Sequence, residues 1–91
     1  MKCDFRPSFL HRIKKITDTS LKKDVERVIE SVMVAQAPKN IPKLKKLQGY
    51  KIFYRIKFGN YRIGVAIEND LITFFECLPR KDFYKSFPAL K

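Results

Sequence analysis

The order of apolar and polar residues predicts a short strand, two helices and three longer strands. Apolar residues recur at steps of three and four in two segments between residues 7 and 37, the spacing of one face of an α-helix. Between residues 50 and 78, apolar and polar residues alternate with a period of two, as they do on a half-buried strand. The alternation is interrupted at Gly59-Asn60 and Asn69-Asp70, two pairs that are typical of hairpin turns.

The first half of the chain is expected to form a strand and a helical hairpin. The strand covers Lys2–Arg6, and the helix that follows it has Ser8 as a plausible N-cap. The second helix is expected over Leu21–Ala37, capped by Asp18 or Ser20 and ended by the proline that comes next.

The second half is expected to form a three-stranded antiparallel meander over Tyr50–Phe58, Asn60–Glu68 and Leu71–Leu78. Residues 37–49 are predicted to be a loop, and Arg80–Phe87 is predicted to form one or two helical turns. The chain is therefore expected to be a single α+β domain of residues 1–91, with the helices packed on one face of the sheet.

Charge narrows the choice of partners. The chain has 20 Lys and Arg against nine Asp and Glu, a net charge of +11, and no acidic residue occurs from Ser31 through Ile67. A small domain with this excess of positive charge favours polyanionic partners, namely nucleic acid, an acidic protein or a membrane surface. No transmembrane span or signal-peptide apolar region is recognised, so we expect a cytoplasmic protein that does not bind a membrane.

Metal and disulfide chemistry are not expected. The two cysteines, Cys3 and Cys77, are predicted to be free thiols in strand interiors. The single histidine, His11, is expected on the surface of the first helix, and Cys and His do not occur at zinc-ligand spacing. The sequence therefore predicts no cofactor.

The hairpin around Gly59-Asn60 is the strongest candidate site. This turn places Lys57 opposite Arg62 and Arg55 opposite Gly64, and the period of two puts the three cations on one face. Directly opposed like charges destabilise a sheet by up to about 1 kcal/mol, and a bound phosphate reverses that effect. The missing side chain at Gly64 is expected to let a ligand approach. A solvated cationic face is the alternative interpretation.

A second group of residues follows the last strand. Arg80 emerges at the end of that strand, and Tyr84 returns about one helical turn later, where it can stack on a base, donate a proton or pack in the core. Exposed lysines of the loop and its surroundings are expected to contact RNA backbone, the alternative being ordinary solvated side chains. These lysines are Lys39, Lys43, Lys45, Lys46, Lys51 and Lys81.

Taken in order, four segments resemble the RelE/ParE superfamily of toxins from type II toxin–antitoxin systems. The segments are Lys45-Lys46-Leu47-Gln48-Gly49-Tyr50, Tyr54-Arg55-Ile56-Lys57, Gly59-Asn60-Tyr61-Arg62-Ile63 and Arg80-Lys81-Asp82-Phe83-Tyr84. The resemblance covers nearly the whole chain. It implies a small antiparallel sheet with a helical hairpin, and a cognate antitoxin as partner.

The resemblance also implies an activity. The RelE branch cleaves mRNA in the ribosomal A site, whereas the ParE branch inhibits DNA gyrase without cleaving RNA. Carried over by position, the residues that match the catalytic set of the RelE branch are Arg55, Lys57, Arg62, Arg80 and Tyr84.

The chain departs from the family pattern in two ways. Pro79 stands where many relatives have a histidine, and Glu76, the acid nearest the site, is expected on the helix-covered side of the sheet. A ribosome-dependent mRNA endonuclease is favoured, and a gyrase inhibitor and a basic RNA-binding module are the alternatives. Which group would be the general base and which the acid stays open.

Overall fold

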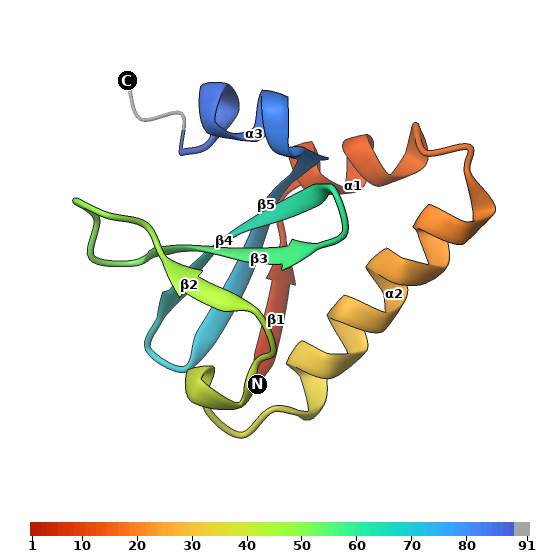
Figure 1. Ribbon diagram of the computed structural model, residues 1–91. Coiled ribbons are helices and arrows are strands. Elements are labelled where there is room, and N and C mark those ends of the chain that lie inside the picture. Colours follow the sequence, from red (N-terminus) through yellow and green to blue (C-terminus); the bar gives the residue numbers. More distant parts are fainter. Residues whose placement is uncertain (89–91) are drawn as a thin grey trace.

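The computed structural model of the protein describes residues 1–88, in which the chain forms a five-stranded mixed sheet (Figure 1). The strand order is β1-β5-β4-β3-β2, with β1 parallel to β5 and the other neighbours antiparallel. The strands are β1 (Lys2–Phe5), β2 (Leu44–Lys46), β3 (Phe53–Phe58), β4 (Tyr61–Glu68) and β5 (Leu71–Pro79).

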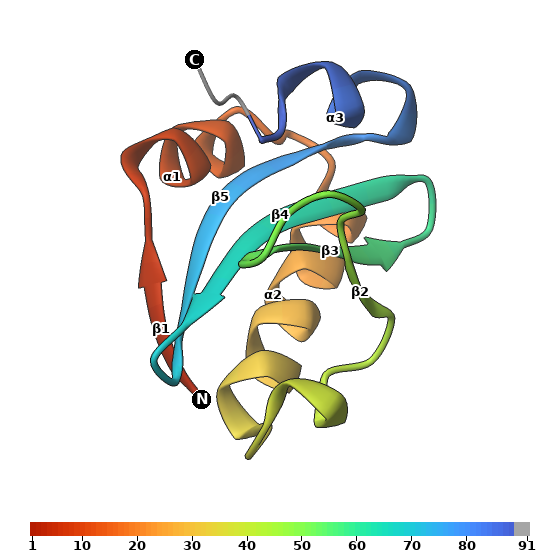
Figure 2. The same cartoon turned by 90° about the vertical axis from the view of Figure 1, so that its left-hand side faces the viewer.

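Helices lie on both sides of this sheet (Figure 2). The two helices of the hairpin come between β1 and β2, and a short third helix follows β5. Their bounds are α1 (Pro7–Lys14), α2 (Thr19–Val34) and α3 (Arg80–Ser86), with a 3₁₀ turn, η1 (Pro38–Asn40), after α2.

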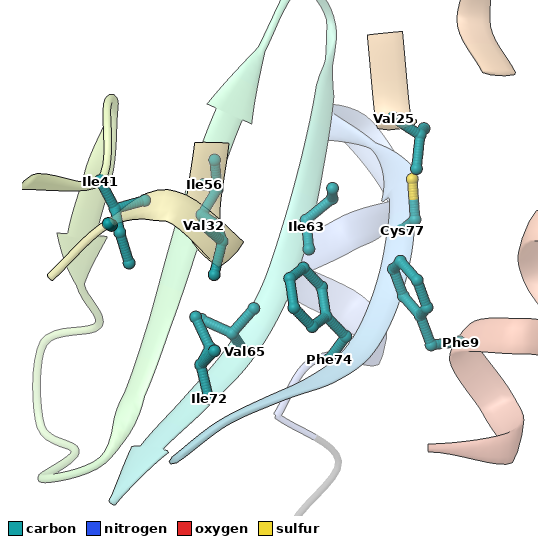
Figure 3. Close-up of a cluster of buried hydrophobic side chains, with 11 residues drawn as sticks. Phe9, Val25, Val32, Ile41, Ile56, Ile63, Val65, Ile72, Phe74 and Cys77 are labelled. Atoms are coloured by element: carbon teal, nitrogen blue, oxygen red, sulfur yellow. The ribbon is translucent and has the colours of Figure 1, made fainter. Parts of the chain in front are cut away.

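The main core lies between α2 and the sheet (Figure 3). Val25 and Val32 of α2 are fully buried against inward-facing residues of β3, β4 and β5, and Phe9 of α1 joins them. The strand residues of this cluster include Ile56, Ile63, Val65, Ile72, Phe74 and Cys77. We call this side of the sheet the α2 face.

A second, smaller cluster lies on the opposite side. Cys77 belongs to the main core and Leu78 to the second cluster, and successive residues of a strand point to opposite faces. Phe83 of α3 and Phe87 just after it are buried against Leu78, with Phe53 and Phe75 packed around them. We call this side the α3 face.

The predicted α+β fold is confirmed, as are both hairpin turns. The helices were expected on one face of the sheet, but α3 packs on the face opposite α2, because Leu78, Phe83 and Phe87 form a second apolar cluster there. The predicted register around Gly59-Asn60 is also confirmed, with Lys57 opposite Arg62 and Arg55 opposite Gly64. The prediction of an unbroken loop over residues 37–49 is wrong, because Leu44–Lys46 pairs with β3 at the edge of the sheet. Three residues are too few to carry a period-two signal.

The strand predicted from Tyr50 begins only at Phe53. The Leu47 N–H donates to the Phe53 carbonyl over 2.9 Å, and the Tyr50 N–H donates to the Leu47 carbonyl over 3.3 Å. These bonds close a loop that takes Tyr50 and Lys51 out of the sheet, whereas the Ile52 carbonyl still accepts from the Ile67 N–H of β4 over 2.9 Å. Gly49 at φ +87° gives this loop a conformation that other residues rarely adopt.

The helix ends are partly as predicted. The Asp18 carboxylate caps α2 by accepting from the N–H groups of Ser20 and Leu21. The prediction of Ser8 as a cap is wrong, because Arg6 is the N-cap of α1 and the Ser8 hydroxyl donates to the Phe75 carbonyl over 2.8 Å. The second helix ends at Val34, three residues before the predicted end.

The described part of the chain contains no helix with the length and apolar character that a membrane span requires.

Candidate functional site

The cations of the hairpin lie on the α3 face. Arg55, Lys57 and Arg62 share this face because they occupy paired positions of β3 and β4. Lys45 of β2 lies opposite Arg55 on the same face, and we call these four residues the cation row. Lys57 is exposed and Arg55 is half-buried, with its Nη1 donating to the Lys43 carbonyl over 3.1 Å. Within residues 1–88, the two ion pairs are Arg12–Glu76 and Arg27–Asp24, so the cations of this row have no described carboxylate partner.

Arg62 is on the predicted face but is not open to solvent, which corrects the prediction of an exposed three-cation patch. It is 6% exposed, and its Nη1 donates to the carbonyls of Tyr61 over 2.9 Å and Gly59 over 3.3 Å. Its Nε is buried without a hydrogen-bond partner among the described residues. The cause is α3, because Leu78, the β5 neighbour of Arg62, belongs to the cluster that α3 covers.

Arg80 and Tyr84 both lie on α3. The Arg80 N–H donates to the Asn60 carbonyl over 2.8 Å, which ties the start of α3 to the β3–β4 turn and brings Arg80 to the same end of the sheet as Lys57. Tyr84 is 54% exposed, and its ring meets that of Phe83 edge-on with 5.0 Å between centroids. Tyr84 lines a groove with the loop between β2 and β3.

The lysines predicted to contact RNA are all exposed and come from four parts of the fold. Two lie on β2, two on the segment that precedes it, one on the β2–β3 loop and one on α3. In that order they are Lys45 and Lys46, Lys39 and Lys43, Lys51, and Lys81.

Gly64 does not leave space for a ligand, contrary to the prediction. A Cβ atom at this position would lie 2.6–2.9 Å from three ring carbons of Phe87. The Phe87 ring therefore rests on the Gly64 backbone and fills the space that the missing side chain leaves. Glycine at this position allows α3 to be held against the sheet.

Glu76 was predicted on the helix-covered side together with the main core, and this is wrong. The register shifts between Gly64 and Val65, so that Glu76 pairs with Gly64 on the α3 face. Its carboxylate accepts from Arg12 of α1 at 2.7 Å and 3.2 Å, and this hydrogen bonding raises the pKa of the Arg12 guanidinium. Glu76 thus forms its ion pair with Arg12 of α1 and not with a residue of the cation row.

The two cysteines and the possible metal ligands were also located among the described residues. Burial raises the pKa of the Cys77 thiol to about 12, which keeps it protonated near neutral pH. Burial also raises the pKa of Cys3. Both thiols are free. Within residues 1–88, no three His, Cys, Asp or Glu side chains come together in a way that could hold a metal ion.

Comparison with known proteins identifies the family. No family model matches this chain. The curated protein Toxin RelE3 of Methanocaldococcus jannaschii is 34% identical over 89 residues, which cover 97% of this chain and 100% of that protein. A chain of the RelB-RelE antitoxin-toxin complex from Methanococcus jannaschii matches with a TM-score of 0.77 at 32% identity, over 93% of this chain and 99% of that one.

A more distant structure has the same fold. The isolated RelE toxin of E. coli matches with a TM-score of 0.64 at 16% identity, over 86% of this chain and 82% of that one. The resemblance that the sequence motifs indicated is confirmed. The chain, with its cation row and its helix-covered α3 face, belongs to the RelE family of type II toxins.

Proposed function

We propose that this toxin is an endoribonuclease that cleaves mRNA in the ribosomal A site without a metal ion. The observation that carries the proposal is the cation row on the α3 face, which lacks a described carboxylate partner and has Arg80 tied beside it. Uncompensated cations in one place attract a phosphodiester and stabilise the negative charge that develops on it during cleavage.

The residues of the proposed site fall into groups with different roles. Arg55 and Arg80 would contact the phosphate, because a guanidinium can donate two parallel hydrogen bonds to it. Lys57, an exposed member of the row, would lie next to the reacting ribose, and Tyr84 would stack on a base or donate a proton to the leaving oxygen.

Arg62 has a positioning role in this proposal. Its guanidinium donates to the carbonyls of the β3–β4 turn, the same turn whose Asn60 carbonyl accepts from Arg80. Arg62 therefore holds the turn to which Arg80 is attached. Its own contact with RNA would require these hydrogen bonds to be exchanged.

Ribosomal RNA and an antitoxin are the proposed macromolecular partners. The exposed lysines of β2, its flanking loops and α3 would contact the RNA backbone, where positive charge is the main requirement. The relative from Methanococcus jannaschii was solved as an antitoxin–toxin complex with RelB. By analogy, we propose that a cognate antitoxin binds and neutralises this toxin.

Cleavage on programmed ribosomes tests the proposal. Arg80→Ala and Lys57→Ala should each lower the rate of mRNA cleavage by about 10²–10³-fold, because each removes a cation from the place where negative charge develops during cleavage. Both side chains are exposed, so the melting temperature of each variant should stay close to that of the wild type. Lys23→Ala, an exposed lysine of α2, is the matched control and should cleave at the wild-type rate.

Mapping of transcript ends after induced expression separates the alternatives. The endonuclease should produce new 5′ ends within translated codons. Intact transcripts together with accumulated DNA breaks would instead identify a gyrase inhibitor and contradict the proposal.

A further inference from the structure

A groove of about 330 Å³ separates the β2–β3 loop from the end of α3. Two segments more than 30 residues apart in the sequence form its walls, and each contributes a tyrosine. The lining residues are Leu47, Gln48, Tyr50, Tyr84, Phe87 and Pro88.

The two tyrosines are unusually accessible. Tyr50 is 37% exposed and Tyr84 is 54% exposed. Five large apolar side chains in residues 1–88 are exposed to this extent, and the two tyrosines are the aromatic ones. Exposed aromatic side chains that border one groove present flat surfaces on which an unpaired base can stack.

Both tyrosines pack against a chain of phenylalanine rings. Tyr50 packs edge-on against Phe53 at 5.7 Å, Phe53 against Phe87 at 5.5 Å, and Phe87 against Phe83 at 5.4 Å. Phe83 in turn packs against Tyr84 at 5.0 Å. The two exposed rings are thus the ends of one aromatic cluster in which Phe83 and Phe87 are buried, and these contacts restrict both tyrosines before a ligand binds.

The surroundings of the groove favour a nucleic acid over an apolar peptide. Exposed lysines follow directly on the tyrosines of both walls in the sequence, Lys51 after Tyr50 and Lys85 after Tyr84. The floor residue Phe87 rests on Gly64, which lies opposite Arg55 of the cation row. The Gln48 amide supplies a donor and an acceptor for the edge of a base.

We propose that Tyr50 and Tyr84 hold a single base of the bound RNA between them, with Gln48 contacting its edge. This inference rests on the proposed function, and it adds Tyr50 and Gln48 as positioning residues for the RNA strand. We expect this base to belong to a nucleotide near the scissile phosphate, because Phe87 lines the groove and also rests on Gly64, the strand neighbour of Arg55.

Binding of a fluorescent oligonucleotide tests whether a base stacks in this groove. The probe is a single-stranded RNA that carries 2-aminopurine and is 2′-O-methylated throughout, so that it cannot be cleaved. Stacking quenches 2-aminopurine, and the wild-type toxin should therefore quench it on binding. Tyr50→Ala and Tyr50→Leu should each bind about 10-fold more weakly with reduced quenching, since a stacked base contributes about 1–3 kcal/mol.

Two further variants serve as controls. Tyr50→Phe keeps the ring and should bind and quench like the wild type. Leu10→Ala removes an apolar side chain that is 50% exposed on α1 and should also behave like the wild type. Tyr50→Leu keeps apolar contact with Phe53, so it separates the loss of stacking from a loss of folding.

If Tyr50→Leu binds and quenches the probe as strongly as the wild type does, the proposal that a base stacks between the two tyrosines is wrong. If the wild-type toxin does not cleave mRNA on ribosomes but quenching of the probe still depends on Tyr50, the proposed function is wrong while base stacking in the groove is supported. If the toxin cleaves mRNA while Tyr50→Leu has an unchanged KM and unchanged quenching, the proposed function is supported and only base stacking in the groove is wrong.

Discussion

Single residues of the α3 face have roles that follow from what packs on them. Arg62 has the residue type and the register of a phosphate ligand, yet it donates to backbone carbonyls and is almost fully buried. Gly64 has the appearance of an opening for a ligand, yet Phe87 occupies that space. Both outcomes come from the same event, the packing of α3 on this face.

Gly64→Ala should destabilise the protein by about 1–3 kcal/mol, because the new methyl group overlaps the Phe87 ring and forces it to move. Urea denaturation of the purified variant measures the change in the free energy of unfolding. The same substitution should also loosen α3 and increase the exposure of Arg62.

A double-mutant cycle identifies the cause of this change. When Phe87→Ala is already present, Gly64→Ala should cost much less, because the ring that it meets is gone. An equal cost in both backgrounds would show that the overlap with Phe87 is not the source of the instability.

At the scale of elements, α1 is held to the sheet by two polar contacts with β5. The Ser8 hydroxyl donates to the Phe75 carbonyl, and Arg12 forms a bidentate ion pair with Glu76. The β-bulge at Gly64 and Val65 makes the second contact possible, since it turns Glu76 away from the main core.

Arg12→Ala should lower the free energy of unfolding by about 1–3 kcal/mol, because it leaves the Glu76 carboxylate, 13% exposed, without its partner. Thermal denaturation and urea denaturation both measure this loss. The matched control is Arg27→Ala, which breaks an ion pair whose side chains are 73% and 46% exposed. That control should cost about 0–1 kcal/mol, and equal losses for the two variants would contradict the anchoring role of Arg12.

At the scale of the whole molecule, the dominant property is the net charge of +11. The acidic residues of the described chain lie mainly on the helices and the β4–β5 turn, whereas β2, β3 and their loops carry lysines and arginines. The charge is therefore concentrated on one part of the surface rather than spread evenly.

Salt dependence of ribosome binding should reveal which part of the surface meets RNA. The logarithm of the binding constant should fall linearly with the logarithm of the salt concentration, and each lost phosphate contact should reduce the slope by about 0.7–0.9. The double variant Lys45→Gln/Lys46→Gln should reduce the slope by roughly twice that amount.

Lys22→Gln/Lys23→Gln changes the net charge equally on α2 and is the control for this measurement. Its slope should match that of the wild type. Identical slopes for both double variants would mean that overall charge, and not the surface around β2, governs binding.

Much of the fold and of the cation row could be read from local pattern. The period of two and the pairs Gly59-Asn60 and Asn69-Asp70 were enough to predict β3, β4, β5 and the register of the first hairpin, because a tight turn dictates which residues face each other. The Asp18 cap was predictable for the same reason, since its partners are two and three residues away. The motifs that indicated the RelE family also lie within short segments.

Contacts between distant segments decided the rest. The Arg12–Glu76 pair spans 64 positions, Phe87 meets Gly64 from beyond the sheet, and the tyrosine groove joins a loop to a helix that comes more than 30 residues later. A one-residue bulge places Glu76 on the α3 face, and the alternation of residue types along the strand does not indicate such a bulge. Burial and side-chain partners depend on which surfaces pack together, and that packing exists only once the chain has folded.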